Sequence, residues 1–146
     1  MTTTGIEQMD TRQANIDDFG KLYTFWEEAG LHLYPKDEER VRFATMLRLN
    51  PDLCLLLLDD NKQIVGSVLG GFDGRTASIN RLAIHPKLQK QGWGKYLIHE
   101  LEKIFLARGI RKIAIQIHKL NTEVIPFYKK LGFVEMDYVE MFYKDF

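Results

Sequence analysis

The chain has 146 residues, 45% of them hydrophobic and 27% charged, which suits one folded domain with a core of its own. Its twenty Lys and Arg residues balance twenty Asp and Glu residues, so no net charge favours binding to nucleic acid. No apolar run approaches the roughly 20 residues that a membrane-spanning helix needs, and the first residues do not resemble a signal peptide. We therefore expect a cytoplasmic protein with a flexible lead-in over residues 1–8 and a single domain over residues 9–146.

The single cysteine of the chain excludes an internal disulfide and fits a reducing compartment. Cys54 lies within the apolar run 53–58, where no neighbouring group would activate its thiol. We interpret it as a small buried side chain rather than a reactive one.

The first third of the chain predicts a short strand followed by two helices. The strand covers residues 9–12. Apolar side chains recur at helical spacing over residues 16–28, and Asn15 is expected to cap this first helix. An extended loop over residues 31–35 follows, and Asp37 is expected to cap the second helix.

Three apolar runs come next, each bounded by turn residues. They cover residues 53–58, 64–69 and 78–85, and the short turns between them predict an antiparallel meander. The first run is apolar throughout, which is typical of a strand covered on both faces.

The last part of the chain returns to alternating helices and strands. A helix beginning near Lys95, a strand over 112–117 and a shorter helix from Asn121 are followed by two closing strands over 133–136 and 139–143. The predicted class is therefore α+β, with about four helices and a mixed, mostly antiparallel sheet.

The segment from Gln89 to Gly94 joins the end of a predicted strand to the start of a predicted helix. The first backbone N–H groups of a helix have no partners within it and attract anions. Glycines at positions 92 and 94 let a ligand approach the backbone without meeting a Cβ atom. The segment therefore predicts a site for a phosphate-containing ligand.

Two common nucleotide-binding patterns are not met at this segment. The P-loop pattern requires a glycine where Gln89 stands, and a Ser or Thr where Tyr96 stands. The Rossmann pattern requires a third glycine where Leu97 stands, and a βαβ unit in place of the antiparallel meander.

Two segments together resemble the GNAT N-acetyltransferase superfamily. Gln89-x-x-Gly92-x-Gly94 is similar to its acetyl-CoA signature, Gln/Arg-x-x-Gly-x-Gly/Ala, and Leu82-Ala83-Ile84-His85-Pro86 matches the strand before it. Asn121 and the run from Pro126 to Phe133 are similar to the second motif of the family. The resemblance covers nearly the whole chain and implies an acyl-CoA N-acyltransferase fold with a splayed parallel pair of strands. It also implies that acetyl-CoA is the co-substrate, that no metal is used, and that a primary amine is acetylated by direct attack on the thioester.

The resemblance further implies how the ligand lies. The CoA pyrophosphate would lie on the first N–H groups of the helix, and the pantetheine arm would pair with the preceding strand. Side chains of Gln89, Lys90 and Lys95 could add contacts to phosphate, although the lysines are equally consistent with solvated surface charges. The residues implied in acetyl-CoA binding are Leu82, Ala83, Ile84, Gln89, Lys90, Gln91, Gly92, Trp93, Gly94, Lys95, Asn121 and Tyr128.

For catalysis, Tyr128 matches the tyrosine that many members use to protonate the departing CoA sulfur, and a core aromatic is its structural alternative. The general base is not identified, because Gln116 stands where several members carry a glutamate. A glutamine cannot accept the proton of the amine. His118 is the nearest titratable residue, although a histidine at the end of a strand is commonly a surface residue.

The acceptor remains open at the level of sequence. Members of the family usually line the acceptor site with the first two helices and the loop between them, where acids beside aromatics suit a cationic amine. A solvated helix face explains the acids equally well. The missing glutamate leaves a non-catalytic CoA-binding or regulatory module as the alternative function, and the closing strands leave a homodimer open. The candidate substrate-binding residues are Trp26, Glu27, Tyr34 and His118, and the expected partner is a small-molecule or peptide amine.

Overall fold

The computed structural model describes residues 9–146, so the expected lead-in over residues 1–8 lies outside the described residues. The chain divides into two compact units, which meet in the sequence between Ile115 and Gln116. The expectation of a single domain over residues 9–146 stays a prediction. No helix within residues 9–146 has the length and apolar character that crossing a membrane requires. A cytoplasmic location stays a prediction as well.

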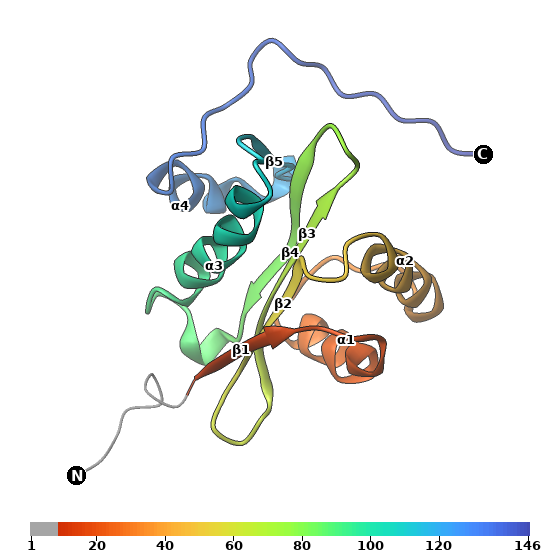
Figure 1. Ribbon diagram of the computed structural model, residues 1–146, viewed down its shortest axis with the longest axis vertical. Helices are drawn as coiled ribbons and strands as arrows, with labels where there is room; N and C mark the ends of the chain where they lie inside the picture. The colour runs from red at the N-terminus through yellow and green to blue at the C-terminus, as the bar shows by residue number, and fades with distance from the viewer. Residues whose placement is uncertain (1–8) are drawn as a thin grey trace. The chain divides into compact units, whose positions relative to one another are not determined.

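A five-stranded sheet lies at the centre of the first unit, with its strands side by side in chain order (Figure 1). Each strand from β1 to β4 pairs antiparallel with the next, whereas β4 and β5 pair parallel. The strands are β1 (Asp10–Gln13), β2 (Cys54–Leu58), β3 (Ile64–Phe72), β4 (Ala77–Ile84) and β5 (Ile113–Ile115). The mixed sheet confirms the predicted α+β class, the meander and the short first strand.

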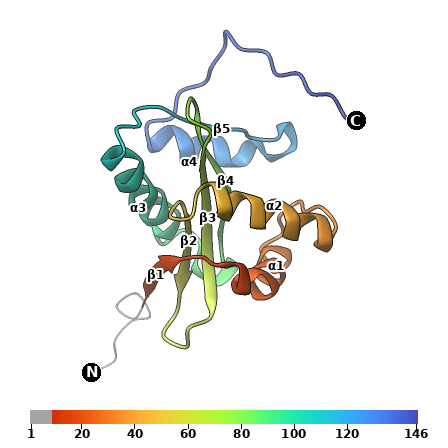
Figure 2. The ribbon, with the colours of Figure 1, turned by 45° about the vertical axis from the view of Figure 1, so that its right-hand side comes forward.

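Helices cover both faces of this sheet (Figures 1 and 2). On one face lie α1 (Phe19–Glu28) and α2 (Lys36–Leu49), and on the other lies α3 (Trp93–Ala107). Because both faces are covered, all residues of β2 are buried, which explains its continuous apolar run. The core under α1 and α2 includes Phe19, Trp26, Phe43, Leu56 and Leu69, and α3 buries Leu97, Ile98, Leu101 and Phe105.

The two helix starts in the first third of the chain differ in how well the sequence predicts them. Asn15 forms the expected capping box with Asp18, although the turn Ile16–Asp18 is a 3-10 helix and α1 begins only after it. The predicted cap at Asp37 is wrong. The helix begins directly after Pro35, and Asp37 lies in the first turn, where its charge favours the positive end of the helix.

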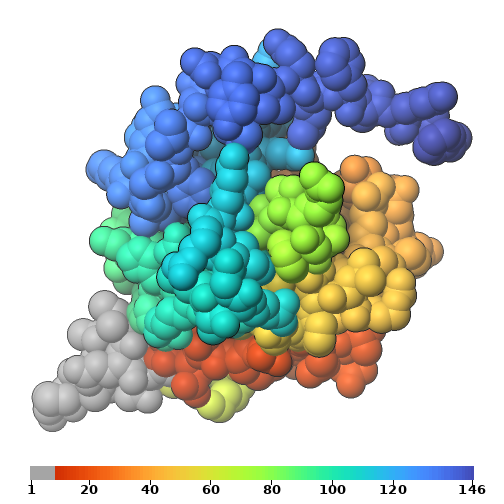
Figure 3. All heavy atoms as spheres, turned by 45° about the horizontal axis from the view of Figure 1, so that its top comes forward, coloured from red at the N-terminus to blue at the C-terminus, as the bar shows by residue number. Residues whose placement is uncertain are grey.

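The strand β3 is longer than the sequence predicts, because it continues through Gly70 and Gly71 to Phe72. A Cβ at Gly70 would lie 2.9 Å from a methyl carbon of Leu101, so this glycine permits the close approach of α3. Beyond Phe72, the turn between β3 and β4 lies beside the end of α2 (Figure 3). There, the side-chain oxygen of Asn50 accepts a hydrogen bond from the Phe72 N–H over 3.1 Å.

The second unit, residues 116–146, contains a 3-10 segment (Lys119–Val124) and α4 (Ile125–Lys130). The predicted closing strands over 133–136 and 139–143 are wrong, since the described chain has no strand after α4. A strand exists only where a second strand completes its hydrogen bonds, and apolar alternation alone supplies none. The predicted homodimer, which rested on these strands, stays a prediction. The exposed apolar side chains of this segment include Val134, Tyr138, Met141, Phe142 and Tyr143.

Cys54 gives a direct test of the packing in the first unit. Its side chain is fully buried in β2, as expected, and burial raises the pKa of the thiol to about 12. We expect the native protein not to react with a disulfide reagent at mildly alkaline pH, because the thiol is neither ionised nor accessible. The same reagent should label one thiol in concentrated guanidinium chloride. Rapid labelling of the native protein would contradict this packing.

Candidate active site

One edge of β4 is unpaired at its carboxyl end. Pairing with β5 ends at Ile79 and Ile115, whereas β4 continues to Ile84. On the opposite edge, β4 stays paired with β3 up to Ile84. The predicted ligand-binding segment from Leu82 to Ile84 therefore has a backbone edge that no strand of the described chain covers. An extended ligand could form hydrogen bonds there as an additional strand.

A bulge at Arg81 precedes this open edge. Between the pairs Ser67–Ala83 and Leu69–Asn80, two residues of β4 lie opposite one residue of β3. Arg81 has a φ of 51°, which is a left-handed conformation. For a residue other than glycine, that conformation costs about 1–2 kcal/mol.

The bulge changes which face of the sheet each later residue of β4 occupies. Ile79 lies on the face of the sheet that α3 covers. Its cross-strand partner is Gly70, and a Cβ atom placed on Gly70 would point at Leu101 of α3. Ala83 instead packs in the core under α1 and α2. Without the extra residue, Ile79 and Ala83 would lie on the same face, since side chains alternate with a period of two.

A set of buried polar side chains holds the backbone and the side chain of Arg81 at the bulge. The Ser67 hydroxyl donates to the Arg81 carbonyl over 2.7 Å and accepts from the Trp26 indole N–H over 2.9 Å. A terminal nitrogen of Arg81 lies 3.1 Å from each carboxylate oxygen of Glu39. Glu39 also accepts from the Tyr34 N–H over 2.9 Å. These contacts offset the cost of the left-handed backbone at Arg81.

The loop that follows β4 is held by its own side chains. Gln89 donates from its amide to the carbonyl of Ile84 over 3.1 Å, and Gln91 donates to the carbonyl of Lys87 over 3.3 Å. The Lys87 N–H donates to Nδ1 of His85 over 3.1 Å. The predicted phosphate-binding segment is thus braced against the end of the strand.

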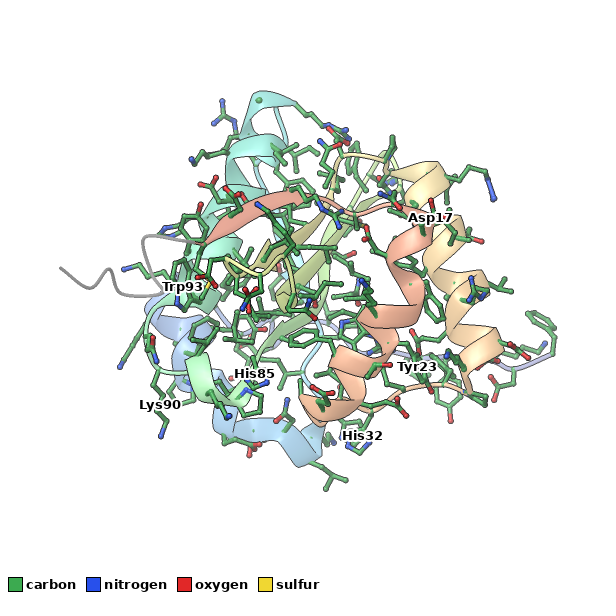
Figure 4. The ribbon with its side chains drawn as sticks, turned by 90° about the horizontal axis from the view of Figure 1, so that it is seen from below. Asp17, Tyr23, His32, His85, Lys90 and Trp93 are labelled. Atoms are coloured by element: carbon green, nitrogen blue, oxygen red, sulfur yellow. The ribbon has the colours of Figure 1, made fainter. Side chains whose placement is uncertain are left out.

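At the start of α3, the backbone leaves its N–H groups without a side-chain acceptor. Gly92 occupies the N-cap position with a φ of 93°, and no side chain caps the helix. A Cβ at Gly92 would meet no atom within 4 Å, so glycine serves the left-handed conformation rather than packing. Lys90, also left-handed with a φ of 63°, is exposed and points away from the loop (Figure 4). Such a set of donors and an adjacent positive charge favours an anion.

Trp93, the first residue of α3, carries a buried donor with no partner. Its side chain is 8% exposed, and within the described chain no group accepts a hydrogen bond from its indole nitrogen. Its ring meets that of Tyr96 edge to face, with centroids 5.5 Å apart. A buried donor left unsatisfied costs about 1–3 kcal/mol.

The second unit carries the remaining candidates. Asn121 is exposed and interrupts the 3-10 segment with a non-helical φ of −121°. His118 precedes that segment, and its Nδ1 accepts from the Leu120 N–H over 3.0 Å. Tyr128 is half-buried, with the rings of Phe127 and Phe133 at centroid distances of 5.0 and 5.6 Å.

The candidates for acceptor binding in the first unit differ in exposure. Trp26 is fully buried and belongs to the core, where its indole N–H is bonded to Ser67. Glu27 is exposed on α1, and Tyr34 is 45% exposed in the loop between α1 and α2. The guanidinium of Arg42 lies 3.8 Å from the Tyr34 ring centroid. In Figure 4, Tyr23 and His32 lie on the same side of the structure, at α1 and the loop after it.

Sequence reasoning missed Arg81 and Glu39. The available signal for Arg81 was that it is the one charged residue in the segment that forms β4. Glu39 carried no such signal, because it reads as one of three successive acids at the start of an exposed helix. Within residues 9–146, no cluster of three or more His, Cys, Asp or Glu side chains is arranged to hold a metal ion.

Comparison with known proteins assigns the class. The model of the acetyltransferase (GNAT) family matches residues 17–133. An acetyltransferase of Pectobacterium atrosepticum is 36% identical over 133 residues, which cover 91% of this chain and 93% of that protein. The chain belongs to the GNAT family of acetyltransferases, as the two motifs implied, and is an N-acetyltransferase by class.

Solved structures agree with this fold. The PaiA N-acetyltransferase of Thermoplasma acidophilum, in complex with coenzyme A, has a TM-score of 0.75 at 21% identity, covering 88% of this chain and 91% of that chain. A protein of Clostridium acetobutylicum described as a predicted acetyltransferase, solved with acetyl-CoA, has a TM-score of 0.74 at 22% identity. That match covers 92% of this chain and 96% of the other.

Tyr128 yields a prediction on pH. Burial raises the pKa of its phenol above the ordinary value of 10.0. The contribution of this phenol to the free energy of unfolding is therefore fully present below pH 10, and it is lost as pH rises through the raised pKa of the folded state. In an alkaline titration followed by absorbance, Tyr128→Phe should form one phenolate fewer than the unmodified protein. We expect this difference between the two titrations to develop above pH 10. A difference that develops at or below pH 10 would contradict the burial of Tyr128.

Proposed function

We propose that this protein transfers the acetyl group of acetyl-CoA to a primary amine by direct attack of the amine on the thioester. The observation that carries the proposal is the continuity of two features in the first unit. The open edge of β4 leads through a braced loop to the uncapped start of α3. A ligand with an extended amide-bearing arm and a pyrophosphate matches both features, and CoA has both parts.

In this proposal, the pantetheine arm pairs with the backbone from Leu82 to Ile84, and the pyrophosphate accepts from the N–H groups of residues 91–95. Lys90 and Lys95 are exposed and add positive charge beside the phosphates. Gln89 acts as the brace of the loop, because its amide already donates to the end of β4. Asn121, by its match to the second motif of the family, binds an amide of the arm.

The chemistry follows from the atoms that change. The amine nitrogen attacks the carbonyl carbon, the carbon–sulfur bond breaks, and the thiolate takes a proton as the amide forms. A backbone N–H between Leu82 and Ile84 donates to the oxyanion. Tyr128 donates the proton to sulfur, and the raised pKa of its phenol keeps it protonated at neutral pH. Gln116 offers no base, so the amine loses its proton to His118 or to water.

The acceptor is a small-molecule, amino-acid or protein amine. Glu27 and Tyr34 are proposed to contact it, because both side chains reach solvent where the family lines its acceptor site. Trp26 supports that site from the core rather than by contact.

Two measurements test the proposed function. Calorimetry should show micromolar binding of acetyl-CoA, and a thiol-release assay with a panel of amines, including peptides with free N-termini, should show turnover. Tyr128→Phe should lower kcat more than it weakens acetyl-CoA binding, because phenylalanine keeps the ring and removes the acid. Absence of acetyl-CoA binding would contradict the proposal. Binding without thiol release from any amine would instead favour the alternative, a regulatory CoA-binding module.

Trp93 gives a sharper test of the ligand's position. We propose that the bound ligand accepts a hydrogen bond from its unpartnered indole N–H. Trp93→Phe should then weaken acetyl-CoA binding about fivefold, the value of one hydrogen bond, because phenylalanine keeps an aromatic ring and lacks the donor. Trp26→Phe is the contrast, because Trp26 has a partner in Ser67 and its loss should lower the melting temperature. Unchanged acetyl-CoA affinity in Trp93→Phe would contradict this contact.

A further inference from the structure

A chain of polar contacts runs from the loop between α1 and α2 to the bulge in β4. At the loop, the Tyr34 N–H donates to Glu39 over 2.9 Å, and the Tyr23 hydroxyl donates to the Tyr34 carbonyl over 3.1 Å. At the strand, the same carboxylate of Glu39 holds a terminal nitrogen of Arg81, 3.1 Å from each oxygen. One carboxylate therefore ties together two backbone segments that are far apart in the sequence.

Burial distinguishes this ion pair from those on the surface. The Glu39 side chain is 5% exposed and that of Arg81 is 25% exposed, whereas Arg12 in its pair with Asp18 is 42% exposed. A buried ion pair is weak evidence for stability, because apolar side chains of similar volume fill such a space as well or better. Removing one partner, however, leaves the other charge uncompensated, so each side chain fixes the other. The pair therefore suits a role in geometry.

We propose that Glu39 and Arg81 are positioning residues that fix the loop over residues 29–35 relative to the backbone at Leu82 and Ala83. This inference rests on the proposed function, in which a backbone N–H between Leu82 and Ile84 donates to the oxygen of the acetyl group and Tyr34 of the loop contacts the acceptor amine. Arg81 acts through its own main chain. Its guanidinium is anchored to α2 and its carbonyl to Ser67, so the left-handed conformation that directs the next N–H groups is held at both ends.

Four variants separate this role from a general loss of structure. Glu39→Gln keeps the size and one acceptor oxygen for the Tyr34 N–H, but removes the charge. Arg81→Gly removes the guanidinium and adopts the left-handed backbone without strain. Arg81→Lys keeps the positive charge and serves as the rescue. Asp18→Asn is the matched control, because it breaks another arginine–carboxylate pair of the first unit, with a distance of 2.7 Å, at the start of α1.

Calorimetry with acetyl-CoA and with CoA measures how well the acetyl group itself is recognised. We expect Glu39→Gln and Arg81→Gly to reduce the preference for acetyl-CoA over CoA about fivefold, as for one misdirected hydrogen bond to the acetyl group. Arg81→Lys should recover part of the preference, and Asp18→Asn should retain it. Equal weakening of both ligands would indicate a merely structural role and overturn the inference. So would an unmodified protein that does not prefer acetyl-CoA.

Hydrogen exchange supplies a readout that needs no ligand. Glu39→Gln should speed exchange at the amides from Leu82 to Ile84 as well as at Tyr34, because the ion pair links the two segments. Faster exchange at Tyr34 alone would overturn the link. If the unmodified protein binds neither CoA nor acetyl-CoA, the proposed function fails, and hydrogen exchange still decides whether the loop and the strand are connected.

Discussion

The first unit depends on one extra residue in β4. The bulge at Arg81 moves Ala83 onto the face covered by α1 and α2, although Ile79 lies on the face covered by α3. Directly beyond the last pair with β5, the strand continues with one edge uncovered by any strand of the described chain. The same short stretch therefore determines which residues of β4 enter the core and which part of its backbone is accessible to a ligand. Its cost is a left-handed arginine, which a buried serine and a buried carboxylate hold in place.

Polar groups are rare in the core of this unit, and those present serve backbone geometry. Glu39, Asn50 and Ser67 are the buried polar residues of the described chain. Ser67 satisfies the carbonyl at the bulge, Asn50 holds the end of β3, and Glu39 binds a backbone N–H in the loop after α1. Each bonds a backbone group that regular helix or strand pairing would leave unsatisfied. Fully satisfied polar networks of this kind specify one arrangement where an apolar core would tolerate several.

Much of the fold could be predicted from the sequence, because local signals and the tertiary structure agree. The capping box at Asn15, the apolar run of β2 and the apolar stripe of α3 each predict a single local structure from a short segment of sequence. The signature Gln89-x-x-Gly92-x-Gly94 and the second motif were sufficient to indicate the family. The bulge could not be predicted, since arginine rarely adopts a positive φ and only the register with β3 reveals the extra residue. The prediction of closing strands failed for a related reason. Alternating apolar residues such as Val134 and Met136 favour an extended conformation, but they provide no partner strand.

We propose that the open edge of β4 and the start of α3 form one continuous binding surface for acetyl-CoA. Backbone amide resonances recorded during a titration with acetyl-CoA test it most directly, because each amide reports on its own surroundings. We expect the largest shifts at Leu82, Ala83 and Ile84 and at residues 91–95, and we expect both sets to saturate at the same ligand concentration. Shifts confined to other parts of the chain, or separate saturation of the two sets, would contradict it.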